Sequence, residues 1–88
     1  MYVIKRDGRK EKFNEGKIVK SAYDACLSSG MNVKDSIKIS QKVLKEVKRA
    51  IGNKRGMKSN VIFHKVRGVL AKHSKECAFM YETHRDIS

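Results

Sequence analysis

Proline is absent from this chain of 88 residues, and cysteine occurs only twice, at Cys26 and Cys77. Two cysteines without a CxxC spacing exclude a disulfide framework. No apolar run is long enough for a membrane span or for the core of a signal peptide. We therefore expect a single domain over residues 1–88 that is soluble, cytoplasmic and not associated with a membrane. The absence of proline suits a short helical protein.

Acidic residues are also scarce. The chain has 9 Asp plus Glu against 21 Lys plus Arg, which gives a formal net charge of +12. Such a surface attracts polyanions, whether nucleic acid, nucleotides or acidic membranes, and charge alone does not choose among them. Only 40% of the residues are apolar, which is enough for one modest core. Stabilisation by a ligand or a partner is therefore expected.

The first residues have the pattern of a β-hairpin. Tyr2-Val3-Ile4 is short and β-prone, and Asp7-Gly8 is a common signal for a two-residue hairpin turn. Residues 9–13 would form the returning strand. The sequence predicts an antiparallel hairpin over about residues 2–13.

Apolar periodicity and capping residues predict four helices, over about residues 15–29, 33–51, 59–73 and 75–87. Each has a side chain that can cap its start: Asn14, Asn32, Ser59 and Ser74. The second helix carries an apolar stripe at spacings of 4, 3, 4, 3 and 4, formed by Val33, Ile37, Ser40, Leu44, Val47 and Ile51. The segment 52–58, with two glycines and three basic residues, is predicted to be a loop or a short edge strand.

This order of elements predicts an α+β fold that is mostly α. Short loops favour antiparallel neighbours, hence a four-helix bundle. An isolated hairpin is marginal in water, so the small antiparallel sheet should pack on the bundle as a lid.

The opening stretch has the chemistry of a phosphate site. Lys5 and Arg6 belong to the hairpin and Lys17 to the following helix, so cations from separate elements meet near a helix start, where exposed N–H groups also favour anions. A base could rest on Val3 and Ile18. The alternative is a charged, solvated hairpin whose lysines contact nothing.

The stretch V-x-K-R-D-G-x-x-E-x-(apolar)-N-x-x-K-I resembles the signature of the ATP-cone. This small nucleotide-sensing domain lies at the N-terminus of many ribonucleotide reductases and also occurs in the bacterial repressor of their genes. Two looser matches follow. The third helix carries Ser59, Ile62, Val66 and Leu70 at family spacing, and the last helix carries Ala78, Tyr81 and Arg85. The resemblance therefore covers nearly all 88 residues and implies a four-helix bundle covered by a small sheet.

The resemblance implies nine nucleotide-binding residues: Val3, Lys5, Arg6, Glu11, Asn14, Lys17, Ile18, Ser59 and Arg85. By this analogy Val3 and Ile18 flank the adenine, and the cations meet the phosphates of ATP or dATP, with or without Mg²⁺. Glu11 and Asn14 would help to fix the base and ribose end.

At the third helix, Ser59 matches a hydroxyl that contacts nucleotide, and Arg85 matches a basic contact near the C-terminus. Some reductase cones have a histidine four residues after that hydroxyl. Here the residue is Phe63, which departs from the family pattern.

The sequence contains no GxxxxGK[ST] loop and no spacing typical of a Ser-His-Asp or Cys-His site. Because the resembling family binds nucleotide as a signal, we expect a non-enzyme. Neither a reductase catalytic domain nor a four-cysteine zinc ribbon accompanies the cone-like segment. The chain is expected to be a free-standing cone or one cut from a larger protein.

Two further patterns have competing interpretations. His73, Cys77, Met80 and His84 advance by 4, 3 and 4, but a cap at Ser74 would interrupt that face, so we expect no metal and a core role for Cys77 and for Cys26. The second helix carries a basic row, Lys34, Lys38, Lys42, Lys45, Lys48 and Arg49. That row is either solubilising charge or a face for nucleic acid or an acidic partner.

Three functions remain open from the sequence. The leading one is a regulatory ATP/dATP-binding module that couples binding to homo-oligomerisation or to docking on an acidic protein. The second is a small basic nucleic-acid-binding protein. The third is an interaction domain whose nucleotide site has decayed, against which the joint presence of Lys5, Arg6, Glu11, Asn14 and Lys17 argues.

Overall fold

The chain begins with a hairpin of β1 (Tyr2–Ile4) and β2 (Lys10–Lys12), which pair antiparallel. A computed structural model describes residues 1–83 of the protein. Lys5 N donates to Arg9 O at 2.8 Å, and Gly8 N donates to Lys5 O at 3.0 Å. Residues 6–8 therefore form the loop, and the two-residue turn predicted at Asp7-Gly8 is wrong. Gly8 has a φ of +88°. A three-residue hairpin loop needs a residue with such a left-handed conformation just before the second strand, and glycine adopts it without strain.

A third strand, β3 (Gly56–Lys58), pairs with β1 in parallel, so the order in the sheet is β2-β1-β3. The sheet is therefore mixed and not purely antiparallel as predicted. Of the two predictions for residues 52–58, the short edge strand is correct. The buried side chain of Met57 holds this strand on the core.

Four helices make up most of residues 1–83: α1 (Glu15–Ser28), α2 (Val33–Ile51), α3 (Ser59–His73) and α4 (Lys75–Thr83). Asn14 Oδ1 accepts a hydrogen bond from Lys17 N at 3.1 Å and caps α1. Asn32 and Asp35 bond reciprocally at the start of α2, with Asp35 N donating to Asn32 Oδ1 at 2.8 Å. The predicted extension of the last helix to residue 87 lies partly outside the described residues.

The start of α3 differs from the prediction. Ser59 is the first residue of the helix, and Lys58 occupies the N-cap position without a side-chain hydrogen bond to the first turn. Ser59 is thus not the cap, and its hydroxyl is left for another contact. At α4 the prediction is correct, because Cys77 N donates to Ser74 Oγ at 3.2 Å.

The buried face of α2 is rotated from the predicted stripe. Its buried residues are Ser36, Ser40, Val43, Val47 and Ile51. Val33 and Ile37, predicted to be in the core, are 54% and 45% exposed. Ser36 and Val43, which the predicted stripe did not include, face the interior instead, and α2 is left with apolar side chains on a second, outward face.

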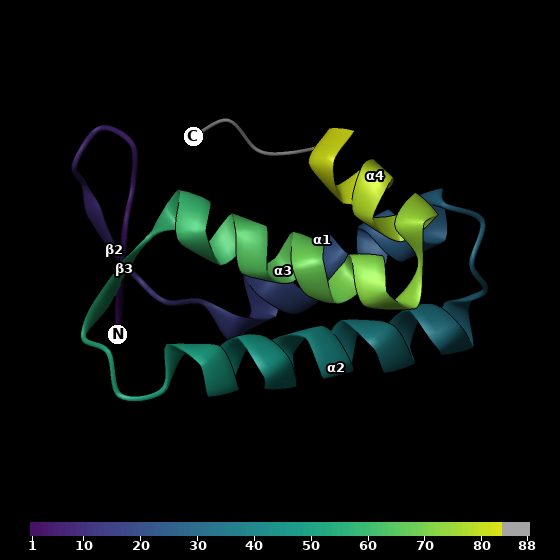
Figure 1. Ribbon diagram of the computed structural model, residues 1–88, viewed down its shortest axis with the longest axis horizontal. Helices are drawn as coiled ribbons and strands as arrows, with labels where there is room; N and C mark the ends of the chain where they lie inside the picture. The colour runs from purple at the N-terminus through teal and green to yellow at the C-terminus, as the bar shows by residue number, and fades with distance from the viewer. Residues whose placement is uncertain (84–88) are drawn as a thin grey trace.

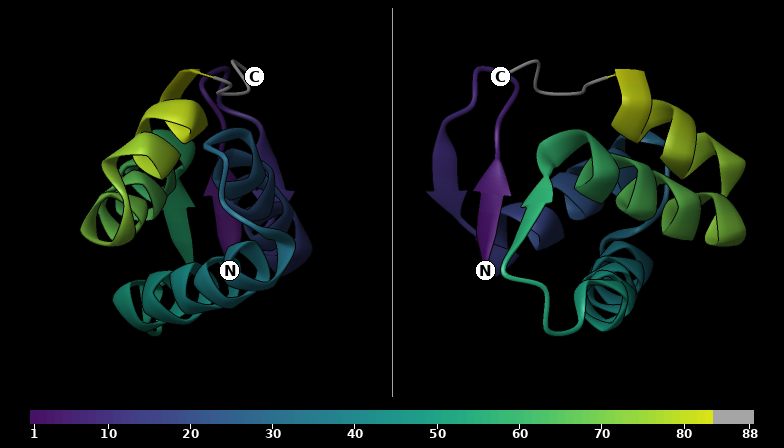
Figure 2. Two further views of the ribbon diagram at one scale, coloured as in Figure 1. Left: turned by 90° about the vertical axis from the view of Figure 1, so that its right-hand side faces the viewer. Right: turned by 60° about the vertical axis from the view of Figure 1, so that its left-hand side comes forward.

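The helices form a bundle in which α1 packs on α2 and α4, and α3 packs on the same two helices. In Figure 1 the sheet lies at one end of this bundle, beside the starts of α1 and α3 and the end of α2. Figure 2 shows the three strands side by side at that end. The α+β, mostly α, fold class is confirmed. None of the helices within residues 1–83 is long and apolar enough to cross a bilayer.

Candidate functional site

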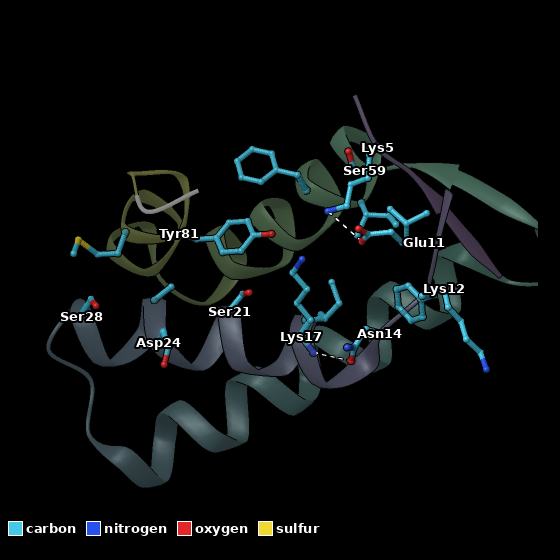
Figure 3. A pocket seen from close by; sticks show the side chains of 17 residues that line it. Lys5, Glu11, Lys12, Asn14, Lys17, Ser21, Asp24, Ser28, Ser59 and Tyr81 are labelled. Carbon is cyan, nitrogen blue, oxygen red and sulfur yellow. Dashed lines mark hydrogen bonds and ion pairs between the residues drawn. The ribbon is translucent and has the colours of Figure 1, made fainter. Parts of the chain in front are cut away.

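A cavity of about 280 Å³ opens between the hairpin, α1, α3 and α4 (Figure 3). It lies where the strands meet the starts of α1 and α3. Ligand pockets in proteins usually enclose about 300–1,000 Å³, so this volume stands near the lower end. The cavity brings together residues from the first strand to the last described helix.

Seven of the nine residues predicted to bind nucleotide line this cavity: Val3, Lys5, Glu11, Asn14, Lys17, Ile18 and Ser59. Of the other two, only Arg6 lies within the described residues. Arg6 lies exposed in the hairpin loop and is not part of the lining. Arg85 lies outside the described residues.

Two ammonium groups reach the cavity from opposite walls. Figure 3 shows the side chain of Lys5 entering from the hairpin and that of Lys17 from α1. Lys5 is only 10% exposed and its Nζ lies 3.6 Å from Glu11 Oε2. Lys12 also borders the cavity, but its side chain extends away from it. Lys5 and Lys17 therefore bring two ammonium groups to a cavity whose lining also includes the carboxylates of Glu11 and Asp24. An anion that enters between the two lysines has a cation on either side.

Asn14, expected to help fix the base and ribose end, can offer a ligand a hydrogen-bond donor. Its Oδ1 already accepts the hydrogen bond from Lys17 N. The amide NH₂ group is the remaining part that can reach a ligand. The acceptor at this end of the cavity is the carboxylate of Glu11.

The N-terminus of α3 adds a second attraction for anions. Within residues 1–83 no side chain caps its first turn, and no acidic residue stands in that turn. Its first N–H groups and its dipole are therefore not offset locally. Ser59, at this helix start, lines the cavity with its hydroxyl. The start of α1, by contrast, already carries the Asn14 cap and Glu15.

The sequence analysis missed a polar row on α1. Ser21, Asp24 and Ser28 line the same cavity as Lys17. They follow Lys17 at spacings of 4, 3 and 4, so they share one helix face. The spacing is visible in the sequence, but polar residues at helical spacing are typical of any solvent-exposed helix face and do not by themselves indicate a site.

Aromatic side chains form the wall contributed by α3 and α4. The rings of Phe63 and Tyr81 stack, with centroids 5.1 Å apart and planes 19° apart. His64 meets Phe63 edge to face at 5.4 Å. Phe63, which departs from the family pattern, thus has a packing role, because it holds Tyr81 at the cavity.

The cysteines and histidines do not form a second reactive centre in the described part of the chain. Burial raises the pKa of Cys26 to about 12, with a smaller contribution from the adjacent Cys77. Cys77 is buried and its Sγ lies 3.3 Å from Ser29 Oγ. His73 ends α3, and Ser74 separates it from Cys77 as predicted. His84 lies outside the described residues.

Comparison with known proteins identifies the family. No curated protein sequence matches the chain. The model of the ATP cone domain, by contrast, matches residues 1–86 of the 88. Domains of this family have a nucleotide-sensing, regulatory role and not a catalytic one. Together with the helical bundle and the small sheet at its end, this match shows that the chain belongs to the ATP cone domain family.

Proposed function

We propose that this protein binds ATP or dATP in the cavity between the hairpin, α1, α3 and α4, and that the bound nucleotide acts as a regulatory signal. One observation carries the proposal. The ammonium groups of Lys5 and Lys17 enter a cavity that Ser59, at the uncapped start of α3, also lines. The apolar side chains of Val3 and Ile18 line the same cavity. A cationic end next to an apolar end matches a nucleotide, whose phosphates and base need these two surroundings.

The phosphates occupy the space between Lys5, Lys17 and Ser59. Hydrogen bonds from ammonium groups to phosphate are charge-assisted, and helix N–H groups add further donors. Arg6 reaches the outer phosphates from the hairpin loop, and Arg85 is proposed as a further cationic contact. Mg²⁺, where present, would be held by the phosphates, since Mg²⁺ is usually bound through substrate phosphates and few protein ligands.

The base lies at the end formed by Val3, Ile18, Glu11 and Asn14. Adenine presents an exocyclic amine, which donates, and ring nitrogens, which accept. The Glu11 carboxylate accepts from the amine, and the Asn14 amide donates to a ring nitrogen. Guanine carries a carbonyl oxygen in place of that amine, so it would face the Glu11 carboxylate with an unpaired acceptor. The arrangement therefore favours adenine.

We further propose that the protein is not an enzyme and that nucleotide binding changes its self-association or its docking on a partner. The thiol of Cys26 is buried and protonated, so it is no nucleophile near pH 7. A cavity built from α1, α3, α4 and the sheet has walls on four separately packed elements. A ligand that contacts all of them can change their relative positions and hence the outer surface.

Isothermal titration and light scattering together test this function. ATP should bind saturably with a small whole-number stoichiometry. GTP should bind about five- to a hundred-and-fifty-fold more weakly, because an acceptor left unpaired in the complex costs about 1–3 kcal/mol. The mass from light scattering should differ between the nucleotide-free and the ATP- or dATP-bound protein. An unchanged mass at concentrations far above Kd would remove self-association from the mechanism and leave docking on a partner.

Nucleic-acid binding remains the second candidate because of one observation. Four lysines of α2, Lys34, Lys38, Lys42 and Lys45, form no ion pair with any residue of the described chain. Binding of this kind should weaken steeply with salt and ignore base identity. Titration of a short DNA duplex at two salt concentrations therefore separates it from adenine sensing.

A further inference from the structure

A second concave surface lies on the other side of α1 from the cavity. It is a groove between α1 and α2, and its apolar lining comes from Val19, Tyr23, Ile37 and Leu44. We call it the α1/α2 groove. Ile37 is 45% exposed there, and Val33, one turn earlier on α2, is 54% exposed. Apolar side chains on one face of a helix are normally buried, so this face of α2 lacks a cover within residues 1–83.

The groove has the length and the spacing of a helix-binding site. On α2 the apolar lining runs from Ile37 to Leu44, seven positions or about 10 Å at 1.5 Å per residue. The exposed Val33, four positions before Ile37, extends this apolar strip to about 16 Å. Val33 and Ile37 are about one helical turn apart, and Ile37 and Leu44 are about two turns apart, so the three side chains lie on one face of α2. A helix of about three turns, with apolar side chains at i, i+3 or i+4, and i+7, fits such a groove.

The charge at the rim determines what kind of helix fits. Helical spacing places Lys34, Lys38 and Lys45 along the outer side of the Val33–Leu44 strip, away from the core. These three lysines form no ion pair in the part of the chain that the structure describes. The nearby acids are already engaged, since Glu15 pairs with Lys48 at 3.1 Å and Asp24 pairs with Lys20 at 3.4 Å.

We infer that the α1/α2 groove docks an amphipathic, acidic helix of a partner protein. The apolar face of that helix covers Val19, Tyr23, Ile37 and Leu44, and its carboxylates meet the free lysines of α2. A second copy of this chain is a poorer occupant, because both copies carry a formal charge of +12 and would bring lysine rows together. Nucleic acid is also a poorer occupant, because its phosphates gain nothing from an apolar floor.

The location of the groove links it to the cavity, a step that rests on the proposed function. Lys17, Ser21 and Ser28 of α1 line the cavity, whereas Val19 and Tyr23 line the groove. The two surfaces thus lie on opposite sides of one helix. A shift of α1 on nucleotide binding would change the width of the groove, and docking would in turn change nucleotide affinity by the same factor.

A synthetic peptide tests the inference. The chain contains no tryptophan, so a peptide with a single tryptophan reports binding through its own fluorescence. The probe has about 14 residues, with leucine and the tryptophan at helical spacing on one face and glutamate elsewhere. A scrambled peptide of the same composition, whose apolar residues do not share a face, is its control. The wild-type protein should bind the probe, more weakly as salt rises, and should bind the scrambled peptide at least about tenfold less well.

Variants of the protein locate the contact. Ile37→Glu should weaken probe binding about tenfold or more, because it replaces an apolar contact with a repelled carboxylate. The matched control is Val61→Glu on α3, an apolar residue that is 39% exposed and does not line the groove. The affinity of the Val61→Glu variant for the peptide should stay within about twofold of that of the wild type. A Lys38→Glu/Lys45→Glu variant, which leaves the apolar side chains intact, should also lose binding.

Three results would overturn the inference. Equal probe binding by Ile37→Glu and Val61→Glu would place the contact elsewhere. A concentration-dependent dimer that Ile37→Glu abolishes would assign the groove to a second copy. Loss of duplex DNA binding in Ile37→Glu would assign it to nucleic acid. ATP binding is measured on the same variants. A variant that binds ATP normally but no longer binds the peptide has lost the groove contact and kept the nucleotide site.

Discussion

The ammonium group of Lys5 lies 3.6 Å from a carboxylate oxygen of Glu11, and the two residues come from neighbouring strands of one hairpin. The Lys5 side chain is 10% exposed, whereas that of Glu11 is 46% exposed. A lysine so far removed from water needs an anion, and Glu11 supplies the only one within ion-pair distance among residues 1–83. The nucleotide proposed here would supply the second through its phosphates. The pair therefore orients Lys5 toward the cavity before any ligand arrives.

Lys17→Ala should weaken ATP binding about ten- to a hundred-and-fifty-fold while leaving the fold intact. A hydrogen bond to a charged group contributes about 1.5–3 kcal/mol, and about 1.4 kcal/mol corresponds to tenfold in affinity. Lys17 is exposed and lies off the buried face of α1, which is formed by Ala22, Ala25 and Cys26. Isothermal titration of the variant with ATP measures the loss.

The control for this variant is Lys42→Ala on α2. Lys48 is less suitable, because it pairs with Glu15 at the start of α1. Lys42 is exposed, forms no ion pair in the described chain and does not line the cavity. Its replacement should change the affinity by less than about twofold. If the Lys17 and Lys42 variants bind ATP with equal affinity, the lysines of the opening stretch do not bind the phosphates, and a charged, solvated hairpin becomes the better interpretation.

Asn14→Ala and Asn32→Ala form a matched pair, since each removes the side-chain cap of one helix. Each should lower the free energy of unfolding by about 1 kcal/mol. Only Asn14 lines the cavity, so only its variant should also lose ATP affinity. Urea unfolding and ATP titration of both variants check this. Loss of affinity in both would mean that helix stability, and not a contact with the ligand, controls binding.

Ser36→Ala should raise the free energy of unfolding by up to about 1 kcal/mol. Ser36 Oγ is buried and has no hydrogen-bond partner among residues 1–83. Removing this hydroxyl therefore removes the cost of burying an unpaired polar group. Ser40 is equally buried on the same helix, but its Oγ donates to Ile37 O at 2.8 Å. Ser40→Ala should therefore destabilise the protein or leave it unchanged. Urea unfolding that ranks the two variants in the reverse order would contradict this account of α2.

The raised pKa of Cys26 predicts a loss of stability at alkaline pH. Burial favours the protonated thiol in the folded protein, whose pKa is about 12 instead of the usual value near 9. The contribution is complete below pH 9 and falls from pH 9 to 12, where the unfolded chain releases the proton and the native chain retains it. Lysines titrate in the same range, so the comparison is with Cys26→Ala. The free energy of unfolding should fall more steeply between pH 8 and 10.5 in the wild type, and parallel curves would refute the assignment.

Local signals in the sequence predicted much of the fold. Asn32 predicted a capped helix start, and the structure has this cap, with two hydrogen bonds between Asn32 and Asp35. Such signals depend on residues that are neighbours in the chain, so one sequence contains them completely. The same holds for the opening stretch, whose strand, loop and helix start lie within 18 residues and bring Lys5, Glu11 and Lys17 to one cavity.

Interactions between distant segments could not be predicted in this way. The parallel pairing of β3 with β1 joins residues more than 50 positions apart, and nothing near Met57 indicates it. On α2 the packing against the other helices buried Ser36 and exposed Ile37, the reverse of their hydrophobicity. The place of Tyr81 in the cavity depends on its stacking with Phe63 from another helix. Each of these outcomes is set by the tertiary packing.

The change in melting temperature on adding nucleotide tests the central claim most directly. ATP at about 100 times its Kd should add about 2.7 kcal/mol, which corresponds to about 10–20 °C in a domain of this size. GTP carries the same triphosphate with a different base, inorganic tripolyphosphate carries it without a base, and short duplex DNA is a polyanion whose bases are paired. The account predicts a large shift with ATP or dATP and a much smaller one with each of these controls. Equal shifts for all of them would contradict adenine recognition and show that the positive charge alone binds polyanions.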